Sequence, residues 1–504
     1  MKRIIFYFFC LSLLISLAHA QTVSVKSGGG GDYSTINDAY AAVKANAATP
    51  DIINIQDVGP YLENIMINTS VTIKGDGVKP TIVSTPTSGG PHSSTDGNAI
   101  SIYTDTGSGG DITVHLENFI LLPDTTTQPT RGIRSNNNAT GLSTDKMTVE
   151  MVDLLVAPNN GSNQPVTTDG MNIVDLTGAA KYADDLTYFT GYVDVSCSGC
   201  IFSNNYGAGV GSADGLIFYP DTVGYYLTVG PGCVFSYMNR IGLQVATDGC
   251  IVRMNGTKDN PIIIKGNWAD KSYTYANGGL AIFHDCNGVP SYNYECNYVY
   301  MCDNNNQGIV TSYADAGEGL PGVTFNNCAF VNNQQVGVSI TDDLIQPWVF
   351  NNCTFANNGL DTSASWAQLN IGEETVGGTT ANITFTDCII AGNGEGDSTD
   401  GNNSISINAS SANVSFSYTS LVQYGSNRLS TAFVLGSGVP APLISNGQSA
   451  DPEFVSLDCG SSDFVDVVSL TYYQKGSGGT DLSGAGDYVG GIPMAADPLW
   501  NLYE

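Results

Sequence analysis

Three stretches of closely similar sequence decide the fold of this chain: Val323-Thr-Phe-Asn-Asn-Cys-Ala-Phe-Val-Asn-Asn333, Trp348-Val-Phe-Asn-Asn-Cys-Thr-Phe-Ala-Asn-Asn358 and Ile383-Thr-Phe-Thr-Asp-Cys-Ile-Ile-Ala-Gly-Asn393. Each stretch is a short alternating apolar run, a polar residue, a cysteine, a second apolar run and a turn of Asn or Gly. Their cysteines are 25 and 35 residues apart. Repeats of this length are typical of stacked solenoid coils and not of an ordinary globular core.

Weaker copies of the same pattern precede these three. Ile112–Pro123 matches Met147–Pro158 at a spacing of 35 residues, and Gly199–Asn205 and Gly232–Met238 continue the series. Their short runs are rich in Thr, Val, Ile and Phe, which favour a pleated surface, while Asn and Gly supply left-handed turns. We therefore predict an all-β, right-handed parallel β-helix, in which equivalent positions stack about 4.8 Å apart.

This stacking predicts two columns of similar residues. The inward column consists of Phe119, Leu154, Cys200, Cys233, Cys328, Cys353 and Cys388, and its thiols are expected to pack as small apolar groups. The second column consists of asparagines that would hydrogen-bond along the stack: Asn204, Asn205, Asn304 to Asn306, Asn332, Asn333, Asn357 and Asn358.

The first 20 residues have the pattern of a secretory signal, with Lys2 and Arg3, an apolar run over 4–17 and a small-residue site ending at Ala20. We expect cleavage near Ala20 and a secreted protein, extracellular or on the cell surface. The apolar run is too short for a membrane span, and no other run is long enough. The predicted division is a signal peptide at 1–20, an N-terminal cap with the first coils at 21–95, coils at 96–425 with an insertion near 255–295, and a closing segment at 426–504.

The charge of the chain limits its partners. Its formal net charge is −30 at pH 7, although only 13% of its residues are charged. A protein this acidic is not expected to bind nucleic acid, and it repels anionic membranes. The negative charge also disfavours binding of a polyanionic sugar, unless a divalent cation such as Ca²⁺ bridges protein and sugar through oxygen ligands.

The start of the folded chain resembles that of pectin methylesterases and pectate-lyase-like right-handed β-helix proteins. The matching residues are Gly31-Asp32-Tyr33, Thr35-Ile36, Ala39, Tyr61-Leu-Glu63 and Ile73-Lys-Gly75. Ser34 or Thr35 is a candidate cap for a short helix whose apolar side chains share one face. The resemblance implies that this helix caps the stack.

The resemblance does not extend to catalytic motifs. The sequence lacks the Gln-Asp-Thr-Leu, Asp-Phe-Ile-Phe-Gly and Arg-Pro-Trp motifs of the esterases, and the Asn-Thr-Asp, Asp-Asp-Cys and Gly-His-Gly motifs of polygalacturonases. Near the other end, Asp451–Phe454, Lys475–Ser477 and Gly486–Gly490 resemble the closing segment of exported bacterial β-helix proteins.

Four carboxylates form the main candidate site. Val338–Asp343 and Leu369–Glu374 align residue for residue at a spacing of 31, which predicts Asp342 beside Glu373 and Asp343 beside Glu374. Acids one coil apart repel each other, which raises a pKa or recruits a cation. We interpret them as a catalytic, substrate-facing or Ca²⁺-binding site; the alternative is that they close turns on a solvated face.

Other candidates for sugar binding lie nearby. Arg240 and Arg253 flank one coil, although isolated arginines more often form surface ion pairs. Aromatic residues that can stack on sugar rings gather in and around the insertion: Tyr225, Tyr226, Trp268, Tyr273, Tyr275, Tyr292 and Tyr294. Cys286 and Cys296 flank a loop-like segment and are the predicted disulfide pair.

Two functions fit these observations. In the first, a secreted pectate-lyase-like β-helix protein binds, and as a lyase or glycoside hydrolase depolymerises, an extracellular polysaccharide. In the second, the protein is a non-catalytic cell-surface or adhesin-type β-helix. In both, the expected partner is a polysaccharide or cell-surface glycan and the expected state is a monomer, while the sequence leaves open whether the protein is an enzyme.

Overall fold

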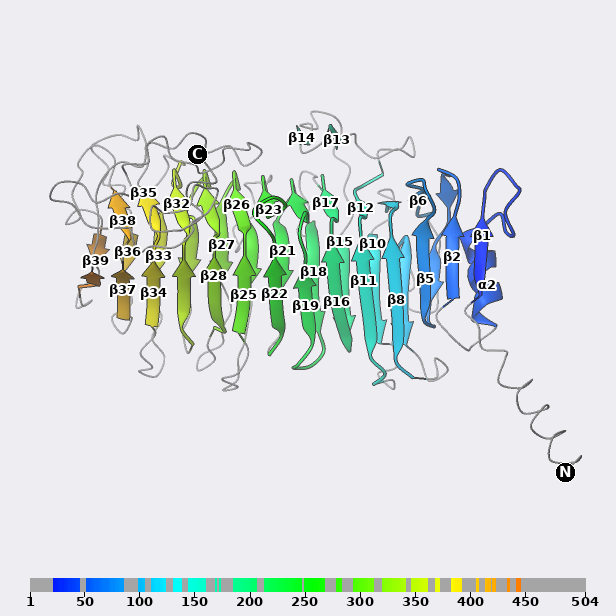
Figure 1. The fold of residues 1–504 in the computed structure, drawn as a ribbon, viewed down its shortest axis with the longest axis horizontal. Coiled ribbons are helices and arrows are strands. Elements are labelled where there is room, and N and C mark those ends of the chain that lie inside the picture. Colours follow the sequence, from blue (N-terminus) through cyan, green and yellow to red (C-terminus); the bar gives the residue numbers. More distant parts are fainter. Residues whose placement is uncertain are drawn as a thin grey trace, which may run out of the picture.

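The computed structural model describes residues 21–45, 51–85, 98–104, 110–123, 130–137, 144–159, 168–169, 172–173, 185–205, 213–246, 249–267, 278–282, 293–311, 320–340, 346–360, 368–371, 382–391, 405–407, 413–417, 419–422, 433–435 and 441–445. In this part of the chain the strands stack side by side along one long axis (Figure 1). They form three long sheets, here called A, B and C, and one small antiparallel pair, β13 (Thr168–Asp169) with β14 (Asn172–Ile173).

Sheet A is parallel and has 14 strands. In order along the axis these are β1 (Thr22–Val25), β2 (Asp51–Ile55), β5 (Val71–Gly75), β8 (Ile112–Glu117), β11 (Met147–Val152), β16 (Val193–Ser198), β19 (Tyr226–Val229), β22 (Ile251–Asn255), β25 (Asn293–Asn297), β28 (Gly322–Asn326), β31 (Trp348–Asn351), β34 (Asn382–Thr386), β37 (Asn413–Ser417) and β40 (Leu443–Ser445). Its inward side chains alternate with more accessible outward ones, as a sheet with one wet face requires.

Sheets B and C are also parallel, with 12 strands each. Sheet B contains β3 (Tyr61–Leu62), β6 (Thr81–Val83), β9 (Ile120–Leu122), β12 (Leu155–Val156), β17 (Ile201–Ser203), β20 (Val234–Ser236), β23 (Ile262–Lys265), β26 (Val299–Cys302), β29 (Ala329–Val331), β32 (Thr354–Ala356), β35 (Ile389–Ala391) and β38 (Ser420–Val422). Sheet C contains β4 (Ile65–Ile67), β7 (Ile100–Thr104), β10 (Arg131–Asn137), β15 (Asp185–Gly191), β18 (Asp214–Pro220), β21 (Ile241–Val245), β24 (Gly278–Ile282), β27 (Gln307–Thr311), β30 (Val338–Ile340), β33 (Leu369–Ile371), β36 (Ile405–Ile407) and β39 (Phe433–Leu435).

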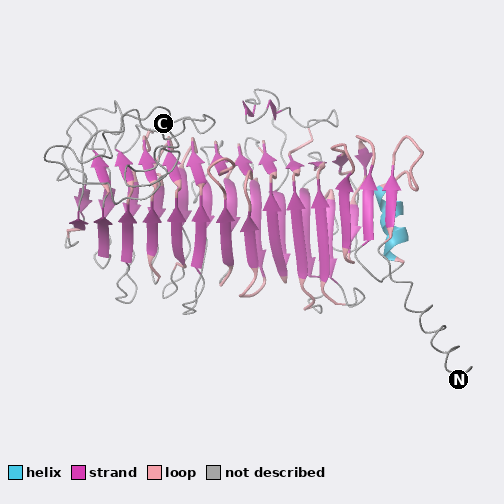
Figure 2. Ribbon diagram, in the orientation of Figure 1, coloured by secondary structure: helices cyan, strands magenta, loops and turns pink. Residues whose placement is uncertain are grey.

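Each coil passes from sheet A to sheet B to sheet C and then starts the next coil. The three repeats that open the sequence stack in register, with Val323 opposite Trp348 and Trp348 opposite Ile383. The predicted right-handed parallel β-helix is therefore confirmed. Its strands dominate Figure 2, where α2 (Ile36–Lys44) is the helix of the described residues and lies beside the first strands.

The turn between sheets A and B explains why Asn or Asp precedes the inward residue in the repeats. Its first residue has a positive φ, for example 54° at Asn327, 53° at Asn352 and 57° at Asp387. Asn and Asp tolerate this left-handed conformation better than other side chains do. The next residue then points inward, and Phe119, Leu154 and the five predicted cysteines are all buried at this position.

A buried asparagine ladder holds the turns between sheets B and C. Asn267 Nδ2 donates to Asn304 Oδ1 (3.0 Å), Asn304 to Asn333 (2.9 Å), and Asn333 to Asn358 (2.8 Å). The last amide donates to Gln368 Oε1 at 2.7 Å. The predicted ladder is thus confirmed at Asn304, Asn333 and Asn358, and Asn332 and Asn357 form a parallel surface bond of 2.7 Å.

The core is mainly aliphatic and contains a column of stacked aromatic rings in its C-terminal coils. Phe325, Phe350, Phe385 and Phe416 stack nearly parallel, with ring centroids 4.9, 4.8 and 4.7 Å apart. Such pairs stabilise a core beyond the burial of their area alone. Identical residues at one position of each coil therefore pack on one another along the axis.

The helix α2 lies against the first strands at the N-terminal end of the stack. Its N-cap is Thr35, whose side chain accepts a hydrogen bond from the Asp38 amide. The carboxylate of Glu63 accepts from the backbone amides of Ile36 (2.9 Å) and Asn37 (2.8 Å). A carboxylate at a helix N-terminus stabilises the helix dipole, so the Tyr-Leu-Glu stretch that carries the family resemblance anchors this helix.

Within the predicted insertion at 255–295, strands β23 and β24 keep their places in sheets B and C, and residues 268–277 and 283–292 lie outside the described residues. Beyond residue 425, β39 and β40 continue sheets C and A. No helix among the described residues is long and apolar enough to cross a membrane.

The predicted Cys286–Cys296 disulfide is wrong. Cys296 is a buried free thiol that pairs in register with Met254 on one side and Phe325 on the other. Cys302, in β26, is disulfide-bonded instead. Cys286 lies outside the described residues.

Candidate functional site

The outer face of sheet A is the most accessible side of the described solenoid. Its outward side chains are partly or fully exposed, whereas the outward Ala281 and Val310 of sheet C are buried. One row along this face crosses six consecutive strands: His115, Glu150, Ser196, Thr228, Arg253 and Glu295. At the usual strand spacing this row extends over roughly 24 Å, which suits an extended ligand better than a small one.

His115 lies between two glutamates on this face. Its Nδ1 is 3.1 Å from Glu150 Oε2, and its Nε2 is 3.2 Å from Glu117 Oε2. Both contacts are hydrogen bonds only when both ring nitrogens carry protons. The imidazole therefore fills the space between the two carboxylates.

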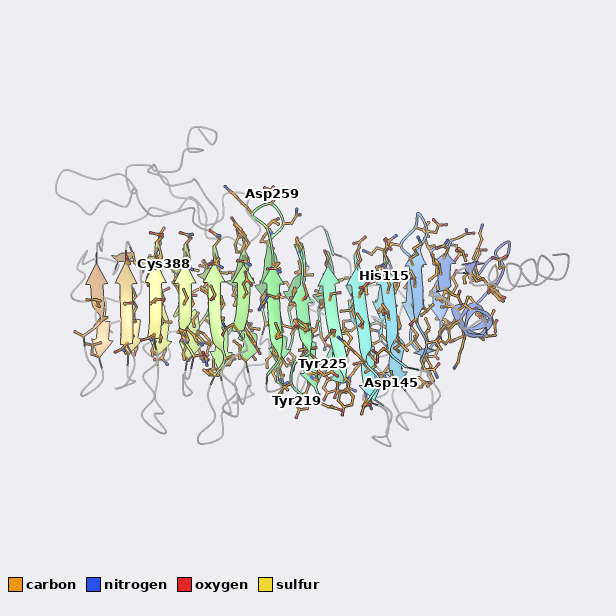
Figure 3. All side chains as sticks on the ribbon, turned by 60° about the horizontal axis from the view of Figure 1, so that its bottom comes forward. His115, Asp145, Tyr219, Tyr225, Asp259 and Cys388 are labelled. Atoms are coloured by element: carbon orange, nitrogen blue, oxygen red, sulfur yellow. The ribbon has the colours of Figure 1, made fainter. Side chains whose placement is uncertain are left out.

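A group of four tyrosines lies where sheet C passes into sheet A. We call Tyr192, Tyr219, Tyr225 and Tyr226 the tyrosine corner; Figure 3 places Tyr219, Tyr225 and Asp145 along the same edge of the molecule. Tyr219, the last residue but one of β18, is 47% exposed, and Tyr226, the first residue of β19, is 45% exposed. The rings of Tyr192 and Tyr225 lie 6.0 Å apart. Exposed aromatic rings grouped in this way mark interaction surfaces.

A lysine and an aspartate support the corner. Lys146 Nζ forms an ion pair with Asp194 and lies 5.9 Å from the centroid of the Tyr225 ring. Asp194 also accepts a hydrogen bond from the Tyr226 amide at 2.9 Å. These contacts fix the two tyrosines relative to the start of sheet A.

A second aspartate is fixed at the same place. Asp221 Oδ1 accepts from Thr190 Oγ1 (3.0 Å) and from the Gly191 amide (3.2 Å), while the residue remains exposed. Partial burial and the nearby charges of Asp194, Asp111 and Asp221 raise the pKa of Tyr225. The Tyr225 phenol therefore keeps its proton at neutral pH and remains a hydrogen-bond donor.

The structure separates the two predicted arginines. Arg253 lies on the outer face of sheet A, where its Nε is 3.5 Å from Glu295 and its Nη1 donates to the Asn293 carbonyl at 2.8 Å. Arg240 directly precedes β21 of sheet C and donates to the buried Asp214 and to Gln244. Arg253 thus belongs to the candidate face, and Arg240 forms an ion pair away from it.

Most of the other predicted site residues lie outside the described residues: Asp342, Asp343, Glu373, Glu374, Trp268, Tyr273, Tyr275 and Tyr292. The register that motivated the acidic site is present in the strands before it, because Val338 pairs with Leu369 and Ile340 with Ile371. Tyr294, by contrast, is buried. In the described part of the chain, no group of three or more His, Cys, Asp or Glu side chains is arranged to hold a metal ion.

Sequence reasoning had named Tyr225 and Tyr226 but missed Tyr192, Tyr219 and their polar partners. The match of Ile112–Pro123 to Met147–Pro158 already placed His115 opposite Glu150, and an outward His–Glu pair could have been read from it. Tyr192 and Tyr219 follow no repeat, since they lie in the link between sheets C and A, whose length differs between coils.

No protein-family model and no curated protein matches this sequence. Several solved structures are similar in fold. Pectate lyase Pel9A is 10% identical, with 94% of this chain and 97% of that chain covered and a TM-score of 0.41. The A-module of mannuronan C-5 epimerase AlgE4 from Azotobacter vinelandii is 13% identical over 81% of this chain and 92% of that chain (TM-score 0.39). The Dettilon tailspike protein gp208 is 12% identical over 86% of this chain and 69% of that chain (TM-score 0.43). At such values the likeness is one of general fold, and no activity follows from it.

Proposed function

We propose that this protein is a secreted β-helix protein that binds an extracellular polysaccharide along the outer face of sheet A. The observation that carries this proposal is the tyrosine corner, where Tyr219 and Tyr226 are exposed. The Tyr226 amide donates to Asp194, and Tyr219 pairs with Thr190, which donates to Asp221. Sugar rings present apolar C–H faces and polar hydroxyl edges. Exposed tyrosine rings offer matching flat apolar area, and neighbouring carboxylate and ammonium groups hydrogen-bond the hydroxyls.

The shape of the face favours a polymer. The row from His115 to Glu295 continues from the tyrosine corner over neighbouring strands, and its outward groups are hydroxyls, carboxylates and a guanidinium. A flat, polar surface of this kind contacts successive sugars of one chain, each weakly. We infer that affinity rises with the length of the polysaccharide.

Binding without cleavage is favoured at the described face. A glycosidase of the usual kind needs two carboxyl groups with room for the sugar and, in inverting enzymes, for a water between them. Here the His115 imidazole occupies the space between Glu117 and Glu150. This observation favours the non-catalytic, surface-binding alternative over depolymerisation by this pair; depolymerisation through Asp342, Asp343, Glu373 and Glu374 remains a separate proposal.

The test is affinity electrophoresis of the full protein through gels that contain soluble neutral, amino-sugar or uronic-acid polysaccharides. We expect retardation in at least one gel, and its loss in the Tyr219→Ala, Tyr226→Ala double variant. Leu62→Ala, which removes another exposed apolar side chain near the N-terminal end, serves as the matched control and should migrate like wild type. Retardation by none of the polysaccharides, or equal retardation of the double variant, overturns the proposal.

The same samples decide between binding and cleavage. New reducing ends would indicate hydrolysis, and products that absorb in the ultraviolet would indicate a lyase. Retardation without either product supports the binding function.

A further inference from the structure

The tyrosine corner has an uneven charge. Burial and the negative charges of Asp194, Asp111 and Asp221 raise the pKa of the Tyr225 phenol. Lys146 is the basic residue in contact with this ring. Lys146 is already engaged, since its side chain pairs with Asp194 and its backbone amide donates to Asp111 at 2.8 Å. The surface beside the exposed rings is therefore negative.

The contacts of Lys146 show how an ammonium group fits this surface. Its amine is held between the Asp194 carboxylate and the face of the Tyr225 ring, 5.9 Å from the ring centroid. A carboxylate next to an aromatic face is a favourable place for a cation, since ion pairing and cation–π attraction act together. Asp221 is a second carboxylate near this ring, since its charge contributes to the raised pKa of Tyr225.

Asp221 is positioned for such a contact. Its backbone amide donates to the Gly191 carbonyl at 3.1 Å, and its Oδ1 accepts from Thr190 and Gly191. Two hydrogen bonds thus orient the carboxylate and a third holds the backbone, while the residue remains exposed, in the turn that joins Tyr219 to Tyr225. A group held in this way loses little conformational entropy when a ligand binds.

We propose that the tyrosine corner selects polysaccharides that carry protonated amino sugars, an inference that rests on the proposed function. The tyrosine rings contact the sugar faces, and Asp221 pairs with the sugar ammonium. Polyuronates are disfavoured because their carboxylates would approach Asp111, Asp194 and Asp221. N-acetylated sugars lack the charge and gain nothing from Asp221.

Non-specific attraction must be separated from the site, because a chain with a net charge of −30 attracts any polycation. Asp221→Asn removes one charge at the corner. Asp259→Asn removes one charge from an exposed turn that Figure 3 places at the opposite edge of the molecule. Any attraction that depends on net charge alone falls equally in both variants.

The experiment is titration calorimetry of the full protein with partly deacetylated chitin oligosaccharides, their fully N-acetylated counterparts and oligogalacturonates of equal length. We expect the deacetylated oligosaccharides to bind most tightly, and Asp221→Asn to weaken that binding about tenfold, as the loss of a charge-assisted hydrogen bond predicts. Asp259→Asn should bind like wild type, and the N-acetylated series should not respond to Asp221→Asn.

The other outcomes overturn the inference in distinguishable ways. Acetylated and deacetylated oligosaccharides could bind equally well, with binding lost in Tyr226→Ala. This result would leave the proposed function in place and refute the preference for amino sugars. If Asp221→Asn and Asp259→Asn weaken the binding of deacetylated oligosaccharides equally, Asp221 is not part of a specific binding site. Tightest binding of oligogalacturonate contradicts the inference directly, and binding of no sugar in calorimetry or gels refutes both proposals.

Discussion

Single residues at the N-terminal end of the solenoid show how local hydrogen bonds set charge and stability. Asp57 accepts hydrogen bonds from the Tyr61 hydroxyl, from Ser27 Oγ (2.9 Å) and from the Gly28 amide (3.3 Å). Partial burial opposes ionisation of this carboxyl, but the hydrogen bonds from Tyr61, Ser27 and Gly28 outweigh it and lower the pKa of Asp57. The ionised form therefore stabilises the contact between the first loop and the turn before β3.

This lowered pKa predicts acid sensitivity. A carboxyl group whose folded pKa lies below its unfolded value, about 3.9, adds stability above that value and loses it as the pH falls through the folded pKa. We expect Asp57→Asn to lower the melting temperature at pH 7, and the gap from wild type to narrow below about pH 4. Thermal melts at pH 7 and pH 3 measure this. A gap of equal size at both pH values would show that Asp57 acts only through packing.

Asn333 is the residue on which the asparagine ladder depends most. It donates to Asn358 at 2.8 Å and to the Met301 carbonyl at 3.1 Å, and it accepts from Asn304 at 2.9 Å. Asn333→Ala leaves several buried polar groups without partners, so we expect a loss of about 3 kcal/mol.

The matched control is Asn351→Ala, on the outer face of sheet A, which removes one bond of 3.0 Å to Asn326 where water can replace it. We expect this variant to lose less than about 1 kcal/mol. Urea unfolding of both variants gives the comparison. Equal losses would mean that burial of the ladder is not what makes it stabilising.

At the scale of strands and turns, close backbone approach accompanies the ladder. A Cβ atom added to Gly308 would lie only 2.4 Å from the Gly337 carbonyl oxygen and 3.2 Å from the side-chain Nδ2 of Asn333. Gly337 has the same relation to Gln368 and Asn358 one coil later. Glycine at the start of sheet C strands therefore lets neighbouring coils approach closely enough for the asparagines to bond.

The inward turn position makes the repeat cysteines unreactive. Cys328, Cys353 and Cys388 are buried free thiols, and burial raises the pKa of Cys353 well above its ordinary value. Because the thiolate is the reactive form, we expect no alkylation of these three residues at pH 8 in the native protein, and full alkylation in denaturant. Mass spectrometry after timed labelling checks this. Rapid native labelling of Cys353 would contradict its burial.

These elements also show what the sequence could and could not predict. The repeated Asn–Cys pattern predicted the turn, the inward column and the asparagine ladder together. One residue in the left-handed conformation determines which way the following side chains point. Cys296 lies outside that phrase, and its burial follows only from its register with Met254 and Phe325. The tyrosine corner joins residues of two coils through links of unequal length, such as Tyr192 alone and the turn before Tyr226, which no repeat specifies.

At the scale of the whole molecule, calcium remains a prediction. The strands before Asp342 and Glu373 pair in register, Ile340 with Ile371, so both carboxylates follow stacked residues. If they bind Ca²⁺ in the folded state only, the ion raises the melting temperature by mass action. We expect a rise of several degrees with Ca²⁺ over chelator in wild type, and its loss in Asp342→Asn, Glu373→Gln.

The control for the calcium experiment is Asp259→Asn, which should keep the wild-type response. An unchanged melting temperature of wild type with Ca²⁺ would mean that these acids only close turns. A higher melting temperature of the double variant without Ca²⁺ would point the same way, since it would reflect relief of repulsion between like charges.

The binding of a polysaccharide to the outer face of sheet A at the tyrosine corner can be measured directly. The most direct measurement is the retardation of wild type and of the Tyr219→Ala, Tyr226→Ala variant in the polysaccharide gels, with Leu62→Ala as control. We predict that wild type and Leu62→Ala are retarded alike and that the double variant migrates as in a gel without polysaccharide. Equal retardation of all three proteins, or of none, would contradict the claim.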